Sequence, residues 1–299
     1  MRYSRLRRAK TRRRYSSIIL LGLVLFLGFY VASAGAAGNF ISRIIAPLIA
    51  SFSNEAEPND KGDISPPPAT DLTLPDNRKN DNSERVTDQI DISPISLYAI
   101  QLAAFNDEKN AQAAAGELQS KGGAGYIYND RYLRLLAMGF LSEDDAQKVR
   151  QQLKDEGIES QIYSITCPGA NMEITASADK VDSIKSAFSL WTDKVKSLEG
   201  IIRDLDTSSI TIDDARNGIG EIISGFTPVL EELKTYSATE ESNHILTGLQ
   251  ELYQYSIESL NAVMDESITN RVAISSKIKY TYIDMIHQYK QYMERITKE

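Results

Sequence analysis

The chain has 299 residues, a formal net charge of −8 and a single cysteine. A chain of this length predicts about two domains. Eight of its 33 basic residues lie within the first 14 positions, so the rest of the chain carries 25 basic against 41 acidic residues. This acidic body argues against nucleic acid as a partner. One cysteine also excludes an intramolecular disulfide.

The N-terminal region has the pattern of a membrane anchor. Residues 15–37 contain no charged side chain and are long enough to span a bilayer, which takes ~20 residues. The basic residues 1–14 in front of them predict a cytoplasmic N-terminus, which places the body of a single-pass membrane protein outside the cytoplasm. The small residues Ala32–Ala34 resemble a signal-peptide cleavage site, so a cleaved segment stays as the alternative.

Two further segments precede the first domain. Residues 38–52 are apolar but are interrupted by Arg43 and Pro47, and they are too short to span a membrane. They predict a helix on the outer membrane surface or an extension of the first helix. Residues 53–94 hold six of the nine prolines and few large apolar side chains. Such a composition cannot offset its ordering entropy, so it predicts a disordered linker.

Residues 97–163 contain one pattern repeated at an offset of 35 residues. In this register Phe105 matches Phe140, and Gly122 matches Gly157. Each half reads as strand, helix and strand, with Asn106 and Ser142 as helix N-caps and the two glycines as helix stops. The predicted strands are 97–104, 124–129, 131–139 and 159–165.

The repeat predicts an α+β fold of the split βαββαβ type, with two helices on one face of a four-stranded antiparallel sheet. The helices can cover only one face, so the other face is expected to be open. The segment Tyr98–Phe105, read Tyr-Ala-Ile-Gln-Leu-Ala-Ala-Phe, and the segment Arg134–Phe140 before Ser142 resemble a SPOR (sporulation-related repeat) domain. Ala103 in place of the usual glycine, and the lack of a proline before Phe140, depart from that pattern.

The resemblance covers residues 95–166 and implies a peptidoglycan-binding domain. In SPOR domains the open face of the sheet binds glycan strands that have lost their stem peptides. Strand alternation places Ala99, Gln101 and Ala103 on this face, together with a set from the third strand. The predicted glycan-binding residues are Gln101, Tyr132, Arg134, Leu136 and Met138.

Planar side chains stack on sugar rings, and amide or guanidinium groups donate to sugar oxygens, which suits this set to a glycan. Tyr126 and Tyr128 share one face of the second strand, but the pattern does not say which, and Tyr163 is a further candidate. Two alternatives remain, in which the face is only solvated or packs against the C-terminal region. The aromatic signature of an RNA-recognition module is missing from the third strand.

Residues 171–299 are predicted as an antiparallel helical bundle. Four apolar stripes with steps of three and four residues follow one another from about Ala176, separated by turns near 206–211, 236–240 and 265–269. The last two stripes also fit a single long helix. An exposed tyrosine patch on these helices would favour a protein partner. The candidates for that patch are Tyr280, Tyr282, Tyr289 and Tyr292.

The chain lacks a constellation typical of catalysis, and no cofactor or metal is expected. The two histidines, His244 and His287, lie in predicted helices. Asp284 and His287 could form half of a metal site, but the spacing fits a solvated helical pair better. Cys167 is expected to be a half-buried, unreactive thiol.

The predicted function is non-enzymatic binding of peptidoglycan by a membrane-anchored protein, which targets it to a division or sporulation septum. The order of tail, anchor, linker and SPOR-like domain resembles septal proteins of the stage II sporulation protein B type. The alternative is an adaptor, in which the C-terminal helices recruit a partner protein and the SPOR-like domain serves only as a localisation signal.

Overall fold

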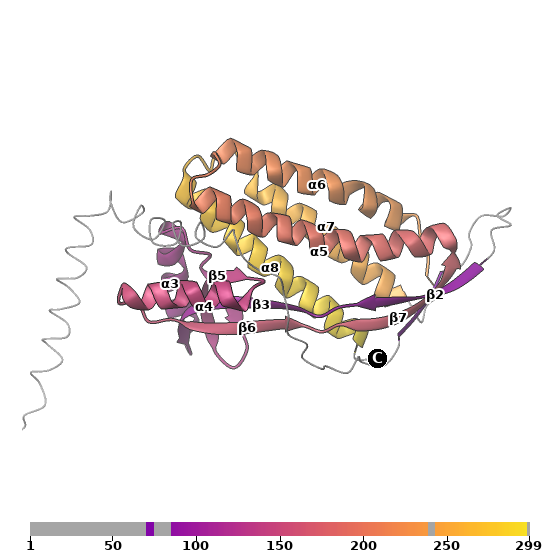
Figure 1. Ribbon diagram of the computed structural model, residues 1–299, viewed down its shortest axis with the longest axis horizontal. Coiled ribbons are helices and arrows are strands. Elements are labelled where there is room, and N and C mark those ends of the chain that lie inside the picture. Colours follow the sequence, from indigo (N-terminus) through magenta and orange to yellow (C-terminus); the bar gives the residue numbers. More distant parts are fainter. Residues whose placement is uncertain (1–69, 75–84, 239–242, 298–299) are drawn as a thin grey trace, which may run out of the picture.

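Figure 1 shows the computed structural model, which describes residues 70–74, 85–238 and 243–297. The predicted basic tail 1–14, membrane helix 15–37 and juxtamembrane segment 38–52 all lie outside these residues. Within the described part of the chain, every helix is too short or too polar to cross a bilayer.

A four-stranded antiparallel sheet confirms the predicted α+β topology. Its strand order is β4-β5-β3-β6, and the helices α3 and α4 lie on one of its faces. The elements are β3 (Ile95–Phe105), α3 (Glu108–Ser120), β4 (Tyr126–Asn129), β5 (Leu133–Phe140), α4 (Glu143–Asp155) and β6 (Gln161–Cys167).

Short polar residues and glycines set the ends of these helices. Asp107 accepts a hydrogen bond from the Asn110 N–H, so α3 is capped one residue later than predicted. Ser142 caps α4 as expected. Gly122 and Gly157 adopt φ of 89° and 77°, a left-handed conformation that glycine reaches at low cost and that ends each helix.

A second sheet occupies part of the predicted linker. It has the strand order β1-β7-β2, and β2 pairs along its whole length with β7. The strands are β1 (Thr70–Thr73), β2 (Arg85–Ile92) and β7 (Ala170–Ser177). The prediction of a disordered linker over 53–94 is therefore wrong for residues 70–73 and 85–92. Their partner β7 lies within the region expected to be helical.

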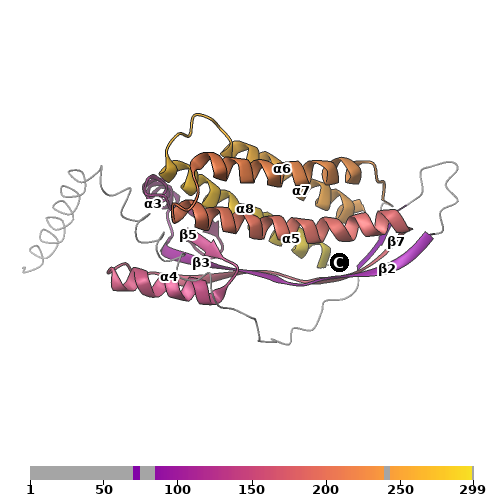
Figure 2. The ribbon, with the colours of Figure 1, turned by 45° about the horizontal axis from the view of Figure 1, so that its top comes forward.

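The two sheets are joined by a long two-stranded ribbon. Ile92 pairs with Ala170 in the second sheet, and Ile95 pairs with Cys167 in the first. Strands β2–β3 and β6–β7 therefore run side by side from one sheet into the other, which Figure 2 shows beneath the helices. We call this pair of strands the long ribbon. Only Ser93–Pro94 and Pro168–Gly169 interrupt it.

Four helices follow the ribbon, and each runs antiparallel to the next. The turns between them fall where the sequence predicts, and the last two stripes form two separate helices. Trp191 stacks on Tyr289 at 4.3 Å between ring centroids, and Phe188 stacks on Tyr292 at 6.1 Å, which ties the first helix to the last. The helices are α5 (Ala178–Asp206), α6 (Ile212–Lys234), α7 (Asn243–Val263) and α8 (Arg271–Thr297).

The last helix lies on the sheet face that was expected to be open. α8 packs on β4, β5 and β6, between the strands and the other helices (Figure 1). Leu97, Leu136 and Ile165 on this face are buried in the same apolar core as the four helices. The expectation of an open face is therefore wrong over most of its area, and the alternative of packing against the C-terminal region holds.

Candidate functional site

One end of this sheet face is not buried under α8. It is formed by the end of β3, the turn between β4 and β5, and the facing part of β6. A group of polar and aromatic side chains converges there, which we call the Arg134 cluster. Its members are Gln101, Asp130, Tyr132, Arg134 and Tyr163.

Arg134 is the centre of the cluster. Its Nε atom donates to both carboxylate oxygens of Asp130, at 2.9 and 3.1 Å, and its Nη1 atom donates to Gln101 Oε1 at 2.9 Å. The guanidinium carbon also lies 4.4 Å from the ring centroid of Tyr163, which is a cation–π distance. These contacts fix the guanidinium plane across three strands.

Asp130 holds the other side of the cluster. Desolvation raises its pKa, but the Tyr132 N–H, the Tyr163 hydroxyl and the Arg134 guanidinium outweigh this and lower the pKa to about 2. Burial and the bond to Asp130 raise the pKa of Tyr163 to about 12. At neutral pH the cluster therefore holds a carboxylate, a guanidinium and a neutral phenol. Asp130 is not among the predicted site residues, and its position after Asn129 in a strand-to-strand turn is the only sequence signal for it.

Tyr132 gives the site an exposed aromatic face. Its side chain is 36 % exposed, and its ring lies 5.7 Å from the Arg134 guanidinium carbon. A groove of about 910 Å³ begins beside it and runs between β3 and the end of α4. Arg150 and Lys154 on α4 add positive charge to this groove, and Glu159 adds one carboxylate.

The structure brings three of the five predicted site residues together and separates the other two. Gln101, Tyr132 and Arg134 meet at the Arg134 cluster. Leu136 is fully buried beneath α8, and Met138 is 2 % exposed within the core between the sheet and its helices. In this conformation neither Leu136 nor Met138 is open to a ligand.

A β-bulge explains the position of Met138. Ile100 pairs with Met138 and Gln101 with Leu136, so Ala137 is an extra residue in β5. Ala103 then pairs with Leu135, so Leu102 is the matching extra residue in β3, and Ala103 packs on the α3/α4 core instead of the predicted open face. A bulge shifts every residue beyond it to the opposite face. Period-2 alternation predicts that Met138 lies on the same face as Arg134. The bulge breaks this alternation after Leu136, so Met138 lies on the opposite face.

Tyr126 and Tyr128 face α8 instead of solvent. The hydroxyl of Tyr126 lies 3.0 Å from Asp284 Oδ1, to which it donates, and 2.8 Å from His287 Nδ1. The ring of Tyr128 lies 4.8 Å from the His287 ring. The expectation of a solvated pair of Asp284 and His287 is thus wrong, because both side chains contact the sheet.

Metal and thiol chemistry find little support in the described residues. No group of three or more potential metal-ligating side chains occurs within them. Cys167 is fully buried, and its thiol donates to the Ile286 carbonyl at 3.6 Å. Burial raises the pKa of this thiol to about 12, so it is protonated and unreactive at neutral pH.

Comparison with known families identifies the first sheet. Residues 94–164 match the family described as SPOR domain, which covers β3 to β6 with α3 and α4. No curated protein and no solved structure matches the chain. The resemblance stated from the sequence is confirmed. A SPOR domain is a binding domain for peptidoglycan and localises to septa.

Proposed function

We propose that this chain binds cell-wall peptidoglycan without enzymatic activity, through denuded glycan strands held at the Arg134 cluster. The match of residues 94–164 to the SPOR domain carries this proposal. The cluster supports it, because it is the part of the SPOR sheet face that α8 leaves accessible and because it holds Gln101, Tyr132 and Arg134 together.

The chemistry of the cluster suits a sugar polymer. Tyr132 offers a ring face for stacking on a pyranose. Within the described residues, Gln101 accepts through Oε1 and Arg134 donates through Nε and Nη1, which leaves Gln101 Nε2 and Arg134 Nη2 as donors for hydroxyl and acetamido oxygens. Asp130 keeps the guanidinium oriented. Arg134, with 19 % of its side chain exposed, is the more accessible donor, since Gln101 is only 8 % exposed. Leu136 is predicted to join the site only if α8 moves away. Met138 faces α3 and α4 and stays buried even then.

We further propose that the protein acts at the outer face of the cell membrane, held there by residues 15–37 with the N-terminus in the cytoplasm. The uncharged stretch and its basic flank support this placement. The septum, at division or sporulation, is the proposed location, in keeping with the resemblance to stage II sporulation protein B type septal proteins.

Sedimentation of the full chain with peptidoglycan sacculi tests the proposal. The protein in detergent is mixed with sacculi, either untreated or treated with an amidase that removes stem peptides. We expect more protein in the pellet after amidase treatment, and a loss of affinity of roughly tenfold for Gln101→Ala and Arg134→Ala. Gln112→Ala and Arg295→Ala, at exposed positions outside the cluster, should pellet like the unchanged chain. Absence of pelleting with both preparations would refute glycan binding.

The adaptor function lacks the surface that was expected to favour it. Tyr282, Tyr289 and Tyr292 are buried among the helices, and only Tyr280 is exposed. The four candidate tyrosines therefore do not form an exposed patch on α8, and the proposal of a protein partner gains no support from them.

A further inference from the structure

The edge of the long ribbon is unpaired over a continuous stretch. β2 lies at the edge of its sheet and pairs only with β7. Residues Ile95–Leu97 of β3 pair with β6 alone, since pairing of β3 with β5 begins at Tyr98. Within the described residues, the edge from β2 to Leu97 thus lacks a strand partner. Every second residue of such an edge directs its N–H and C=O groups outward.

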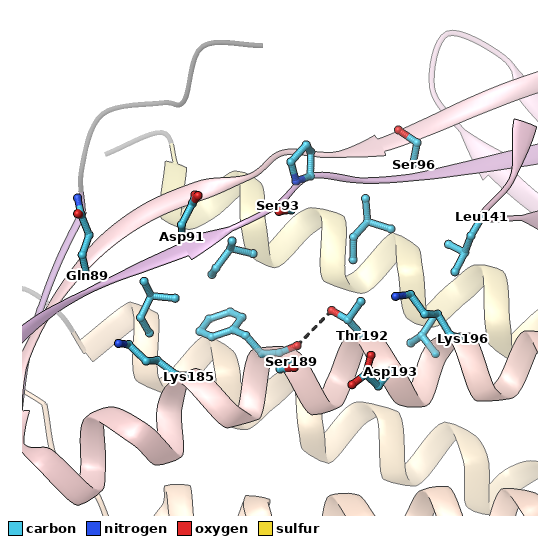
Figure 3. Close-up of a pocket in the computed structure, with 16 residues that line it drawn as sticks. Gln89, Asp91, Ser93, Ser96, Leu141, Lys185, Ser189, Thr192, Asp193 and Lys196 are labelled. Carbon is cyan, nitrogen blue, oxygen red and sulfur yellow. Dashed lines mark hydrogen bonds between the residues drawn. The ribbon is translucent and has the colours of Figure 1, made fainter. Parts of the chain in front are cut away.

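A groove lies along this edge. It has a volume of about 750 Å³ and separates the ribbon from α5. Figure 3 shows its two sides, with Gln89, Asp91, Ser93 and Ser96 along the ribbon and Lys185, Ser189, Thr192, Asp193 and Lys196 along α5. This volume falls within the usual range for ligand sites in proteins.

The groove has an apolar floor between polar walls. Ile90 and Ile92 of β2 face Phe188 and Val195 of α5 across the floor. Ser189 and Thr192 lie on the α5 wall, together with the carboxylate of Asp193 and the ammonium group of Lys196. The walls are thus nearly neutral, so neither sign of charge is selected.

Both ends of the groove are closed by contacts between the helix and the strands. Lys185 of α5 forms an ion pair with Asp88 of β2 at one end. At the other end Glu199 of α5 accepts a hydrogen bond from the N–H of Leu141, the residue after β5. Between these contacts, residues 89–96 span roughly 26 Å at ~3.3 Å per residue. The groove therefore has the length of a short strand.

A strand in this groove would continue the sheet. β5 ends at Phe140, opposite Tyr98, at the point where the unpaired edge begins. A segment placed beyond Leu141 lies in line with β5 and can pair with residues 89–97. Pro94 does not block this pairing. A Cβ added to Gly169 would lie 3.2 Å from the Pro94 nitrogen, so this nitrogen, which lacks a hydrogen, faces the paired side of the ribbon.

We propose that this groove binds an extended peptide segment of a partner protein by β-strand addition, with alternate apolar side chains inserted over Phe188 and Val195. The unpaired edge supplies backbone hydrogen bonds, and the apolar floor selects the alternation. A second folded copy is a poor fit, because its own β2 edge also lies beside α5, which contacts β2. A sugar polymer lacks the regular backbone amides that the edge would satisfy. The inference goes beyond glycan binding at the Arg134 cluster and does not depend on it.

Selection from a random peptide library tests this proposal. Phage displaying peptides of about eight residues are selected on the full chain in detergent. Phage that also bind Ser189→Arg, whose side chain would fill the groove, are removed. We expect the enriched peptides to alternate apolar and polar residues. A selection without enrichment, or enriched sequences without alternation, would overturn the proposal.

A synthetic copy of the most enriched peptide then tests the mode of binding. We expect Ser189→Arg to weaken its affinity about tenfold or more, and Ser197→Arg, an exposed α5 serine outside the groove, to leave it unchanged. Backbone N-methylation of alternate residues on the pairing edge of the peptide should abolish binding. The amides of residues 89–96 should become protected from hydrogen exchange in the complex. Binding that survives N-methylation, or protection elsewhere, would contradict strand addition.

Discussion

A buried ion pair connects α5, α8 and the turn that follows α3. Lys279 Nζ of α8 lies 2.6 Å from Asp206 Oδ2 at the end of α5, and both side chains are almost fully buried. Lys279 also donates to the Gly122 carbonyl at 2.9 Å, and Ser275 donates to Asp206 Oδ1 at 2.6 Å. A pair that is removed from water and hydrogen-bonded in this way is destabilising when only one partner is lost.

Lys279→Met should therefore lower the free energy of unfolding by about 3–5 kcal/mol, because it leaves Asp206 charged and buried. Denaturant titration measures this change. Lys277→Met, at an exposed position of the same helix, should change the stability by no more than about 0.5 kcal/mol. The double variant Lys279→Met with Asp206→Leu should recover much of the loss. Equal effects of the two lysine substitutions would contradict a structural role for the pair.

Asp130 has a pKa of about 2 in the folded protein, below its ordinary value of 3.8. The folded state thus favours the carboxylate, so Asp130 contributes stability above pH ~4 that is lost as the pH falls through ~2. An NMR titration of the side-chain carboxyl should have its midpoint near pH 2 in the unchanged protein. In Arg134→Ala the midpoint should rise, because a guanidinium partner is lost. An unchanged midpoint would show that Arg134 does not hold Asp130.

At the scale of elements, local rules predicted most of the SPOR sheet. Alternation, N-caps and the two glycine stops placed the strands and helices of the repeat within a few residues of their observed ends. The bulge at Ala137 was not predictable, because an extra residue in one strand leaves no mark in a short apolar run. Tertiary contacts decided the rest. The polar sequence of β2 forms a strand because β7 pairs with it and because Ile90 and Ile92 join the apolar core of the helices.

The contact of α8 with the sheet includes a titratable group. Burial lowers the pKa of His287, Asp284 partly opposes this, Lys290 lowers the pKa further and Glu294 raises it. The neutral tyrosines Tyr126 and Tyr128 face the ring from the sheet. An unfolded chain therefore binds a proton at this histidine more readily than the folded one.

The free energy of unfolding should consequently fall as the pH drops through the unfolded pKa of ~6.5, and this loss should end below the folded pKa. Denaturant titrations at several pH values test this. In His287→Gln the pH dependence between roughly pH 5 and 7 should be weaker, because the titrating group is gone. If both proteins show the same dependence, His287 is not the group responsible.

Two glycines lie in contrasting environments. Gly139 is closely packed in the sheet, and Gly200 lies on the open surface of a helix. A Cβ at Gly139 in β5 would lie 2.7 Å from a methyl carbon of Leu97, which is itself buried. Gly139→Ala should cost about 1–3 kcal/mol of stability through overpacking. Gly200→Ala in α5 meets no atom within 4 Å and should add about 0.5–1 kcal/mol through helix propensity. Thermal unfolding of both variants compares them, and a harmless Gly139→Ala would show that the sheet can adjust beneath α8.

At the scale of the whole molecule, the division into a SPOR domain and a separate helical domain does not hold. Leu97, Leu136 and Ile165 of the SPOR sheet share one apolar core with the four C-terminal helices. The long ribbon adds continuous backbone pairing between the two sheets. The sequence suggested two domains because the linker-like composition before β3 and the break at Pro168–Gly169 resemble domain boundaries. Residues 85–94 of the first segment and Pro168–Gly169 instead lie within the ribbon.

We therefore expect the SPOR sheet and the helices to unfold in one transition. Trp191 is the only tryptophan and reports on the helices, while hydrogen exchange of amides in β3 and β5 reports on the sheet. Their denaturant midpoints should coincide, because loss of either part exposes the apolar face of the other. Midpoints that differ would show that the two parts unfold independently. If the helices unfold first, Leu136 becomes accessible on a folded sheet, and this part of the predicted face is available to glycan.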